Sequence, residues 1–133
     1  MKPSHITGTR VLTHADGITR IGTFAYEGKA ASGAPDSLVP AGCTVFYEGP
    51  AVGVLLRRFP PKFATGYHND PAHQHQLIFH LEGHAAGDCK DGSTFHLAPG
   101  DFASVEDPTG TGHSAYDSGG EGFTQIFVSV PGE

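Results

Sequence analysis

The segment 67-YHNDPAHQHQLIFH-80 holds four of the nine histidines in this chain of 133 residues. Neutral imidazole is a versatile metal ligand near neutral pH, and a histidine cluster without thiolates suits zinc, iron, nickel or copper. A further histidine, His113, follows a glycine-rich stretch later in the chain. A metal centre is therefore one interpretation of these residues, beside a pH-titrating switch and a chance feature of the surface composition.

The composition describes one globular domain, because 38% of the residues are hydrophobic and the aromatic residues are spread along the chain. The net charge of −6 offers no general attraction to nucleic acid or to anionic membranes, so neither is an expected partner. Cys43 and Cys89 belong to no CxxC pair and are expected to be free thiols in a reducing compartment. We find no signal-peptide pattern and no apolar run long enough for a membrane span, and we expect a cytoplasmic protein.

Short runs rich in Val, Ile, Phe, Tyr and Thr alternate with Gly, Pro, Asp and Asn, which is typical of an all-β domain. Glycine-dependent turns are predicted at 91–92, 99–101 and 108–112, and the stretch 28–42 is predicted to be the one long loop. Many short strands separated by such turns favour a sandwich or a barrel. Strands are predicted at 20–28, 43–49, 52–59, 75–82, 93–97, 102–106 and 122–130.

The order of motifs between His73 and His113 resembles that of the cupin superfamily. An HxH pair, 73-HQH-75, is followed by the strand and turn 77-LIFHLEG-83, and 99-PGD-101 leads into a PxGxxH motif that ends at His113. The resemblance implies an all-β fold, a cupin jelly-roll β-sandwich or barrel, with a metal at its centre. The implied layout is a single domain over 1–133, with N-terminal strands in 1–60, metal-binding motifs in 67–113 and closing strands in 114–133.

The resemblance also implies that His73, His75 and His113 bind the metal. The position that usually holds a metal-binding Glu carries Gln76 when counted back from the LEG turn, and His80 when counted forward from the HxH pair. Either way the site lacks the usual carboxylate. The expected cofactor is one divalent transition metal, zinc before iron, nickel or manganese.

Two arrangements of the site stay open, because side chains alternate between the two faces of a strand. If 73–75 points its histidines inward without a bulge, Phe79 lines the cavity and His68 is the fourth ligand. If a bulge near residue 75 shifts the phase, Gln76 and His80 enter the cavity instead.

One of His68 and His80 is expected to be the fourth metal ligand, and the other a general base or a hydrogen-bond partner of the substrate. Lys and Arg are scarce near the motifs, which favours an apolar or aromatic substrate over a sugar phosphate. The residues expected to form the substrate pocket are Gln76, Tyr67, Phe79 and Tyr116.

The HQHQ and EDPTGTGH stretches are similar to those of the cupin-class aromatic polyketide cyclases of bacterial antibiotic biosynthesis. This resemblance implies aldol-type cyclisation and dehydration of a poly-β-ketone, free or bound to a carrier protein, by a homodimer that pairs through outer sheet faces. A metal would polarise a ketone beside an acidic CH₂ in a dry pocket. Two other classes stay open: an Fe(II) dioxygenase acting on an aromatic or apolar small molecule, and a non-catalytic ligand-binding cupin.

Overall fold

The computed structural model describes residues 5–31, 42–69 and 74–131. Within these ranges the chain consists of strands and turns without a helix, so the predicted all-β class is confirmed, and no helix there is long and apolar enough to cross a bilayer. The strands are β1 (His5–Thr13), β2 (Thr19–Glu27), β3 (Lys29–Ala30), β4 (Thr44–Val45), β5 (Gly53–Phe59), β6 (Gln74–Glu82), β7 (Ala85–Asp88), β8 (Thr94–Leu97), β9 (Phe102–Glu106), β10 (Tyr116–Asp117) and β11 (Phe123–Pro131).

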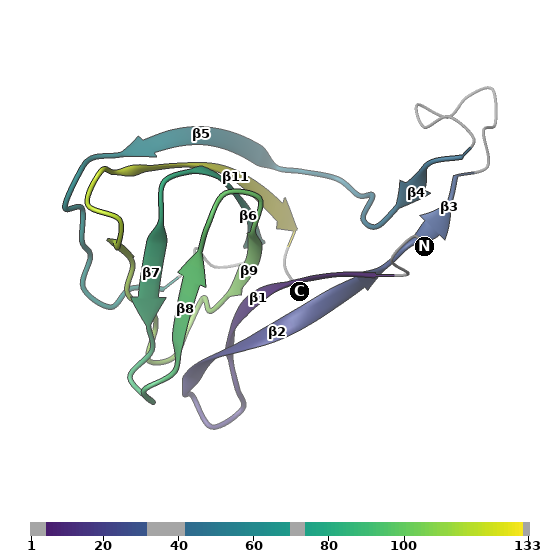
Figure 1. Ribbon diagram of the computed structural model, residues 1–133. Coiled ribbons are helices and arrows are strands. Elements are labelled where there is room, and N and C mark those ends of the chain that lie inside the picture. The colour runs from purple at the N-terminus through teal and green to yellow at the C-terminus, as the bar shows by residue number, and fades with distance from the viewer. Residues whose placement is uncertain (1–4, 32–41, 70–73, 132–133) are drawn as a thin grey trace.

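Two sheets face each other across the body of the molecule (Figure 1). The larger sheet has the strand order β2-β1-β9-β6-β11-β5, and the smaller has the order β10-β7-β8. Strands β1 and β9 run parallel, whereas β6 runs antiparallel to both β9 and β11. The short β3–β4 ribbon projects from the body beyond one end of the β1–β2 hairpin (Figure 1). This double-sheet arrangement is the predicted jelly roll.

The hydrophobic core lies between the two sheets and is centred on stacked aromatic rings. The rings of Phe59 and Phe123 have centroids 4.3 Å apart, and Phe63 packs against Phe59 at 4.8 Å. Complete burial of one such side chain stabilises a fold by about 1.5–3 kcal/mol. The buried cluster contains Val11, Phe59, Ile78, Ala85, Cys89, Leu97, Ala103, Val105 and Phe123.

Six of the seven predicted strands correspond to β2, β5, β6, β8, β9 and β11. The seventh, predicted at 43–49, is reduced to the two residues of β4. Strands β1, β7 and β10 are additions to the prediction. Of the loop predicted at 28–42, residues 32–41 lie outside the described part of the chain, and Lys29–Ala30 form β3.

Strand β7 escaped prediction because Ala85, Ala86 and Gly87 have low β-propensity. Their small size is what the packing requires. Ala85 and Ala86 are fully buried, and a Cβ at Gly87 would overlap the backbone oxygen of Ser114 and the ring of Phe95. Small residues therefore let the smaller sheet approach the segment that follows β9.

The predicted glycine turns are confirmed by backbone angles in the left-handed region. Gly92 has φ +91° between β7 and β8, and Gly100 has φ +94° between β8 and β9. Gly110 and Gly112, with φ +90° and +75°, shape the loop that leads to His113. Glycine adopts such angles without the steric cost that a Cβ imposes.

Candidate functional site

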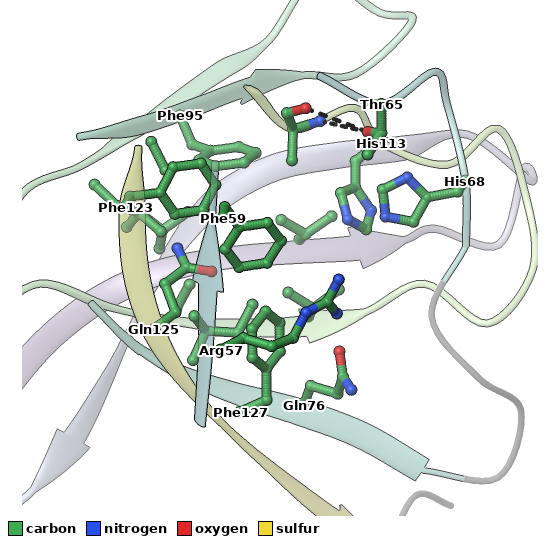
Figure 2. Close-up of a pocket in the computed structure, with 18 of the residues that line it drawn as sticks. Arg57, Phe59, Thr65, His68, Gln76, Phe95, His113, Phe123, Gln125 and Phe127 are labelled. Carbon is green, nitrogen blue, oxygen red and sulfur yellow. Dashed lines mark hydrogen bonds between the residues drawn. The ribbon is translucent and has the colours of Figure 1, made fainter. Parts of the chain in front are cut away.

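A cavity of about 300 Å³ lies between the inner faces of the sheets (Figure 2). Its wall is mainly aromatic and aliphatic, with Phe59, Phe95, Phe123 and Phe127 among the lining residues. An apolar cavity with a few polar groups is the usual form of a small-molecule site, and this volume lies at the small end of the common range of about 300–1,000 Å³. The polar side chains that line it are Thr9, Arg57, Thr65, His68, Asn69, Gln76, His113 and Gln125.

His68 and His113 face each other in a local antiparallel bridge at the cavity wall. The backbone N–H of His68 donates to the carbonyl of His113 over 2.9 Å, and the reverse bond measures 3.0 Å. Thr65 extends this pairing, because its N–H donates to the Ala115 carbonyl and its hydroxyl accepts from the Ala115 N–H (Figure 2). The two imidazole rings therefore lie side by side, with centroids 4.4 Å apart.

Gly112 allows this close approach of the two histidine segments. Its φ of +75° lies in the left-handed region, and a Cβ there would come within 2.5 Å of the carbonyl oxygen of His68. Any side chain at this position would push His68 away from His113. The glycine of the PxGxxH motif thus positions the histidine pair.

Each imidazole of the pair has one nitrogen bound to an acceptor. The Nδ1–H of His113 donates to Oδ2 of the buried Asp107 over 2.6 Å, and the Nδ1–H of His68 donates to the carbonyl of Gly66 over 3.1 Å. A neutral imidazole with a proton on Nδ1 carries its lone pair on Nε2. Both rings therefore have the tautomer that binds a metal through Nε2, and His113 has the carboxylate partner common behind metal-bound histidines.

These donors fit part of a divalent metal site. Gln76 lines the same cavity, so its amide oxygen is available to a metal or to a ligand. No group of three or more His, Cys, Asp or Glu side chains suited to a metal occurs in residues 5–31, 42–69 and 74–131. His73, which the first motif predicts as a ligand, lies outside those ranges.

His75 does not line the cavity, so its position does not fit the metal-binding role that the cupin resemblance implied. Strand β6 pairs with β11 without a register shift at this end, so alternation puts Gln76 on the cavity face and His75 on the outer face. There His75 lies close enough to Glu106 to help lower the pKa of that carboxyl. Burial alone would raise the pKa of Glu106, but hydrogen bonds from Arg10 and Ser104 outweigh it and leave the pKa below its ordinary value.

His80 lies behind the cavity wall, so its predicted roles as fourth ligand and general base do not fit its position. It is 1% exposed, and its ring packs against Phe123. Its Nε2–H donates to the Gly83 carbonyl over 2.6 Å, and its Nδ1 accepts from the Gln125 amide over 3.1 Å. Both ring nitrogens are therefore occupied. The register shift in β6 lies opposite Thr124 and Gln125, near the end of the strand, instead of near residue 75.

Of the four predicted pocket residues, Gln76 lines the cavity. Phe79 faces outward opposite Ile126, and its ring stacks on that of Phe102 with centroids 6.3 Å apart. It faces outward because Gln76 and Ile78, which alternate with it along β6, are the residues that point to the cavity. Tyr67 is 44% exposed, with the ammonium group of Lys90 5.2 Å from its ring centroid. Tyr116 is 41% exposed in β10, at the edge of the smaller sheet. Neither tyrosine lines the cavity.

Three side chains of the candidate site were missed by the sequence reasoning: Arg57, Gln125 and Asp107. Arg57 and Gln125 come from β5 and β11, outside both motifs, and long-range strand pairing brings them to the cavity. The alternation of Arg57 with Phe59 in an apolar strand was the available signal. Asp107 stands six residues before His113, and its burial at 0% exposure was not readable from the sequence.

A jelly roll with a histidine-lined cavity between its sheets is the architecture of a cupin-type protein, and the chain has this fold. It is similar to a sugar phosphate isomerase of the cupin superfamily from Silicibacter pomeroyi, with a TM-score of 0.51 and 20% identity. That match covers 62% of this chain and 52% of the isomerase, so this chain spans about half of that protein's length.

Two further solved structures show the same fold. An uncharacterised protein with a double-stranded β-helix domain from Klebsiella pneumoniae has a TM-score of 0.51 and 27% identity, and the match covers 68% of this chain and 76% of that protein's chain. The Cnp3 cupin domain of Schizosaccharomyces pombe has a TM-score of 0.50 and 13% identity, and the match covers 98% of this chain and 86% of that domain's chain. No family model and no curated protein matches the sequence.

Proposed function

We propose that this cupin-fold protein is a metal-dependent cyclase that acts on a poly-β-ketone or a related β-dicarbonyl compound. The observation that carries the proposal is the His68–His113 pair, with both Nε2 lone pairs available, at the wall of an aromatic cavity. The resemblance of the sequence motifs to aromatic polyketide cyclases supports the same class of substrate.

His68 and His113 would hold the metal through Nε2, with Gln76 and His73 as the further donors to test. A divalent metal, when bound there, would supply Lewis acidity toward a ketone oxygen. Asp107 fixes the ring orientation of His113 and keeps the proton on Nδ1. The histidine pair therefore defines the end of the cavity at which enolisation would occur.

The remaining cavity residues would bind and orient the substrate. The aromatic wall excludes water and holds a flexible chain folded, which favours ring closure over competing reactions. Arg57 lines the same cavity, and its guanidinium would offset negative charge that develops on an enolate oxygen. The methylene between two carbonyl groups is acidic, and a base removes its proton more readily once that charge is stabilised.

The test is an assay of zinc-loaded protein with a synthetic triketone, following ring formation by absorbance and mass spectrometry with and without oxygen. We expect cyclised, dehydrated product at equal rates in both conditions, and loss of the product with His113→Ala. His14→Ala changes an exposed histidine in the turn after β1 and is the matched control.

Turnover that depends on oxygen and iron would replace the cyclase with the Fe(II) dioxygenase. Binding of the aromatic compound without any turnover would indicate a non-catalytic binding protein. Either result would overturn the proposed reaction while leaving the cavity as the site.

A further inference from the structure

We propose that Arg57 and Gln125 form a subsite for a ligand that carries an oxyanion, as a carboxylate or an enolate, close to a hydroxyl group. The proposal rests on the proposed function in taking this cavity as the ligand site, but it does not depend on the metal. It identifies the ligand as an acidic compound with a flat apolar body and one hydrogen-bond donor.

The two side chains form a cross-strand pair on the cavity face of the larger sheet. Arg57 of β5 is the direct partner of Gln125 of β11 in the antiparallel register. Directly opposed residues have Cβ atoms about 4.5–5.5 Å apart and point to the same face. Both line the cavity (Figure 2). A single small molecule can therefore contact both groups.

Arg57 presents its guanidinium group on an aromatic floor. Its Cζ lies 4.5 Å from the ring centroid of Phe59 and 5.6 Å from that of Phe127. Stacking of this kind holds the planar group in place and leaves its edge free to donate. Among the described residues, the ion pairs of arginine involve Arg10, Arg20 and Arg58. Arg57 thus has donors available for an anion that the ligand brings.

The orientation of the Gln125 amide follows from the hydrogen bonds of His80. The Gly83 carbonyl can only accept, so Nε2 of His80 carries the proton and Nδ1 accepts. The group that donates to Nδ1 must then be the amide nitrogen of Gln125. Gln125 is 4% exposed and lines the cavity, and its oxygen has no hydrogen-bond partner in the described part of the chain (Figure 2). Oε1 is therefore a buried acceptor available to the ligand.

A buried acceptor without a partner costs free energy unless a ligand or water donates to it. Gln125 consequently selects for a hydroxyl or enol O–H, while Arg57 selects for an oxyanion. Among the described residues that line the cavity, Arg57 is the one Lys or Arg, so this subsite matches a singly charged acid better than a doubly charged phosphate ester. An enolised β-keto acid and a hydroxylated aromatic acid both have the required groups.

The oxyanion half is tested by calorimetric titration with benzoate and benzamide, which differ in charge and have nearly the same shape. We expect benzoate to bind about tenfold more tightly or better, because the guanidinium bonds a carboxylate more strongly than a neutral amide. Arg57→Met should abolish this preference. Arg58→Met is the matched control, because Arg58 is on the outer face with Glu82 and should leave the preference unchanged.

The hydroxyl half is tested with the three monohydroxybenzoate isomers. At least one isomer should bind more tightly than benzoate, and Gln125→Met should remove that gain while keeping the preference for carboxylate over amide. Benzoylacetone tests whether the oxyanion can be an enolate instead of a carboxylate. A red-shifted enolate absorbance that appears with the wild type and disappears in Arg57→Met would identify an enolate as the bound oxyanion. Circular dichroism of each variant establishes that the fold is retained.

Both titrations are repeated after chelation of metals. A carboxylate preference that survives chelation and requires Arg57 supports the subsite, even if the protein proves to hold no metal and the proposed function fails. A preference that vanishes on chelation, persists in Arg57→Met, or is absent in the wild type overturns it. Failure of every carboxylate and of benzoylacetone to bind the folded wild type overturns it as well.

Discussion

At the scale of single residues, the site depends on which nitrogen of each histidine is bound elsewhere. Asp107 and the Gly66 carbonyl occupy Nδ1 of His113 and His68, so that Nε2 stays available in both rings. His80 shows the opposite case, because the Gly83 carbonyl and Gln125 occupy both of its nitrogens. Histidines that look equivalent in the sequence thus have different chemistry in the fold.

Asp107→Asn tests the role of the carboxylate behind His113. The amide accepts less strongly from Nδ1–H, so the ring is held less firmly and is a poorer ligand. We expect metal affinity to fall by about 10–100-fold, as is typical for loss of such a partner. Competition with a chromophoric chelator measures the change. Asp16→Asn, at an exposed turn, is the control, and an equal loss in both variants would contradict the assigned role.

At the scale of elements, a turn and a strand pairing position the site. The Gly112 turn sets the approach of His68 to His113, and the pairing of β5 with β11 brings Arg57 to the cavity. Another contact joins β1 to β9, where the guanidinium of Arg10 donates to both carboxylate oxygens of Glu106 over 2.7 and 3.0 Å.

Gly112→Ala compared with Gly17→Ala separates backbone strain from steric overlap. Both glycines have φ near +80°, but a Cβ at Gly17 meets no atom within 4 Å, whereas one at Gly112 comes within 2.5 Å of the His68 carbonyl. Strain alone costs about 1–2 kcal/mol. We expect Gly112→Ala to lose more unfolding free energy than Gly17→Ala, measured by urea unfolding. Loss of metal, measured by elemental analysis, is expected for Gly112→Ala alone. Equal effects of the two substitutions would contradict the positioning role of Gly112.

Glu106 makes the stability of the β1–β9 pair dependent on pH. Its folded-state pKa is lowered, so the stability it contributes is complete above the unfolded-state pKa of about 4.5 and is lost as the pH falls through the folded-state pKa. Glu106→Gln should be less stable than the wild type at neutral pH and lose less stability between about pH 5 and about pH 3. Urea unfolding across this interval tests the expectation, and parallel pH profiles would refute it.

At the scale of the whole molecule, the outer face of the larger sheet has large exposed apolar side chains. Val54, Leu56, Phe79 and Leu81 are 70%, 65%, 40% and 44% exposed. Val54 and Leu56 of β5 pair with Val128 and Ile126 of β11, so the exposed residues continue across neighbouring strands. Exposed apolar patches of this kind commonly mark interaction surfaces. The homodimer stays a prediction, and this face is where we expect a second copy to pack.

Leu56→Glu tests the dimer, because a buried carboxylate at the centre of an apolar interface would oppose association. The wild type should have twice the chain mass of 13.9 kDa in light scattering, and the variant should have the monomer mass. Thr23→Glu, at an exposed position of β2, is the matched control and should remain dimeric. A monomeric wild type would exclude this interface.

The fold was largely predictable from the sequence, because alternating apolar residues and glycine turns are local signals. It was harder to predict which side chains of a strand point to the cavity and which point outward. The HxH spacing suggested that His75 points inward, but a strand's two faces are assigned only by its partners, and pairing with β11 puts Gln76 there instead. Arg57 was overlooked for the same reason. Its alternation with Phe59 puts both side chains on one face of β5, but only the pairing with β11 turns that face toward the cavity.

The most direct test of the metal centre is elemental analysis of the purified protein and of single His→Ala variants. We predict about one divalent transition metal ion per chain in the wild type, zinc first, as is usual for a mononuclear imidazole site. We also predict loss of the metal in His68→Ala and His113→Ala, and retention in His75→Ala, whose side chain faces outward. A wild type without metal after zinc loading, or a His113→Ala variant that keeps its full metal content, would contradict it.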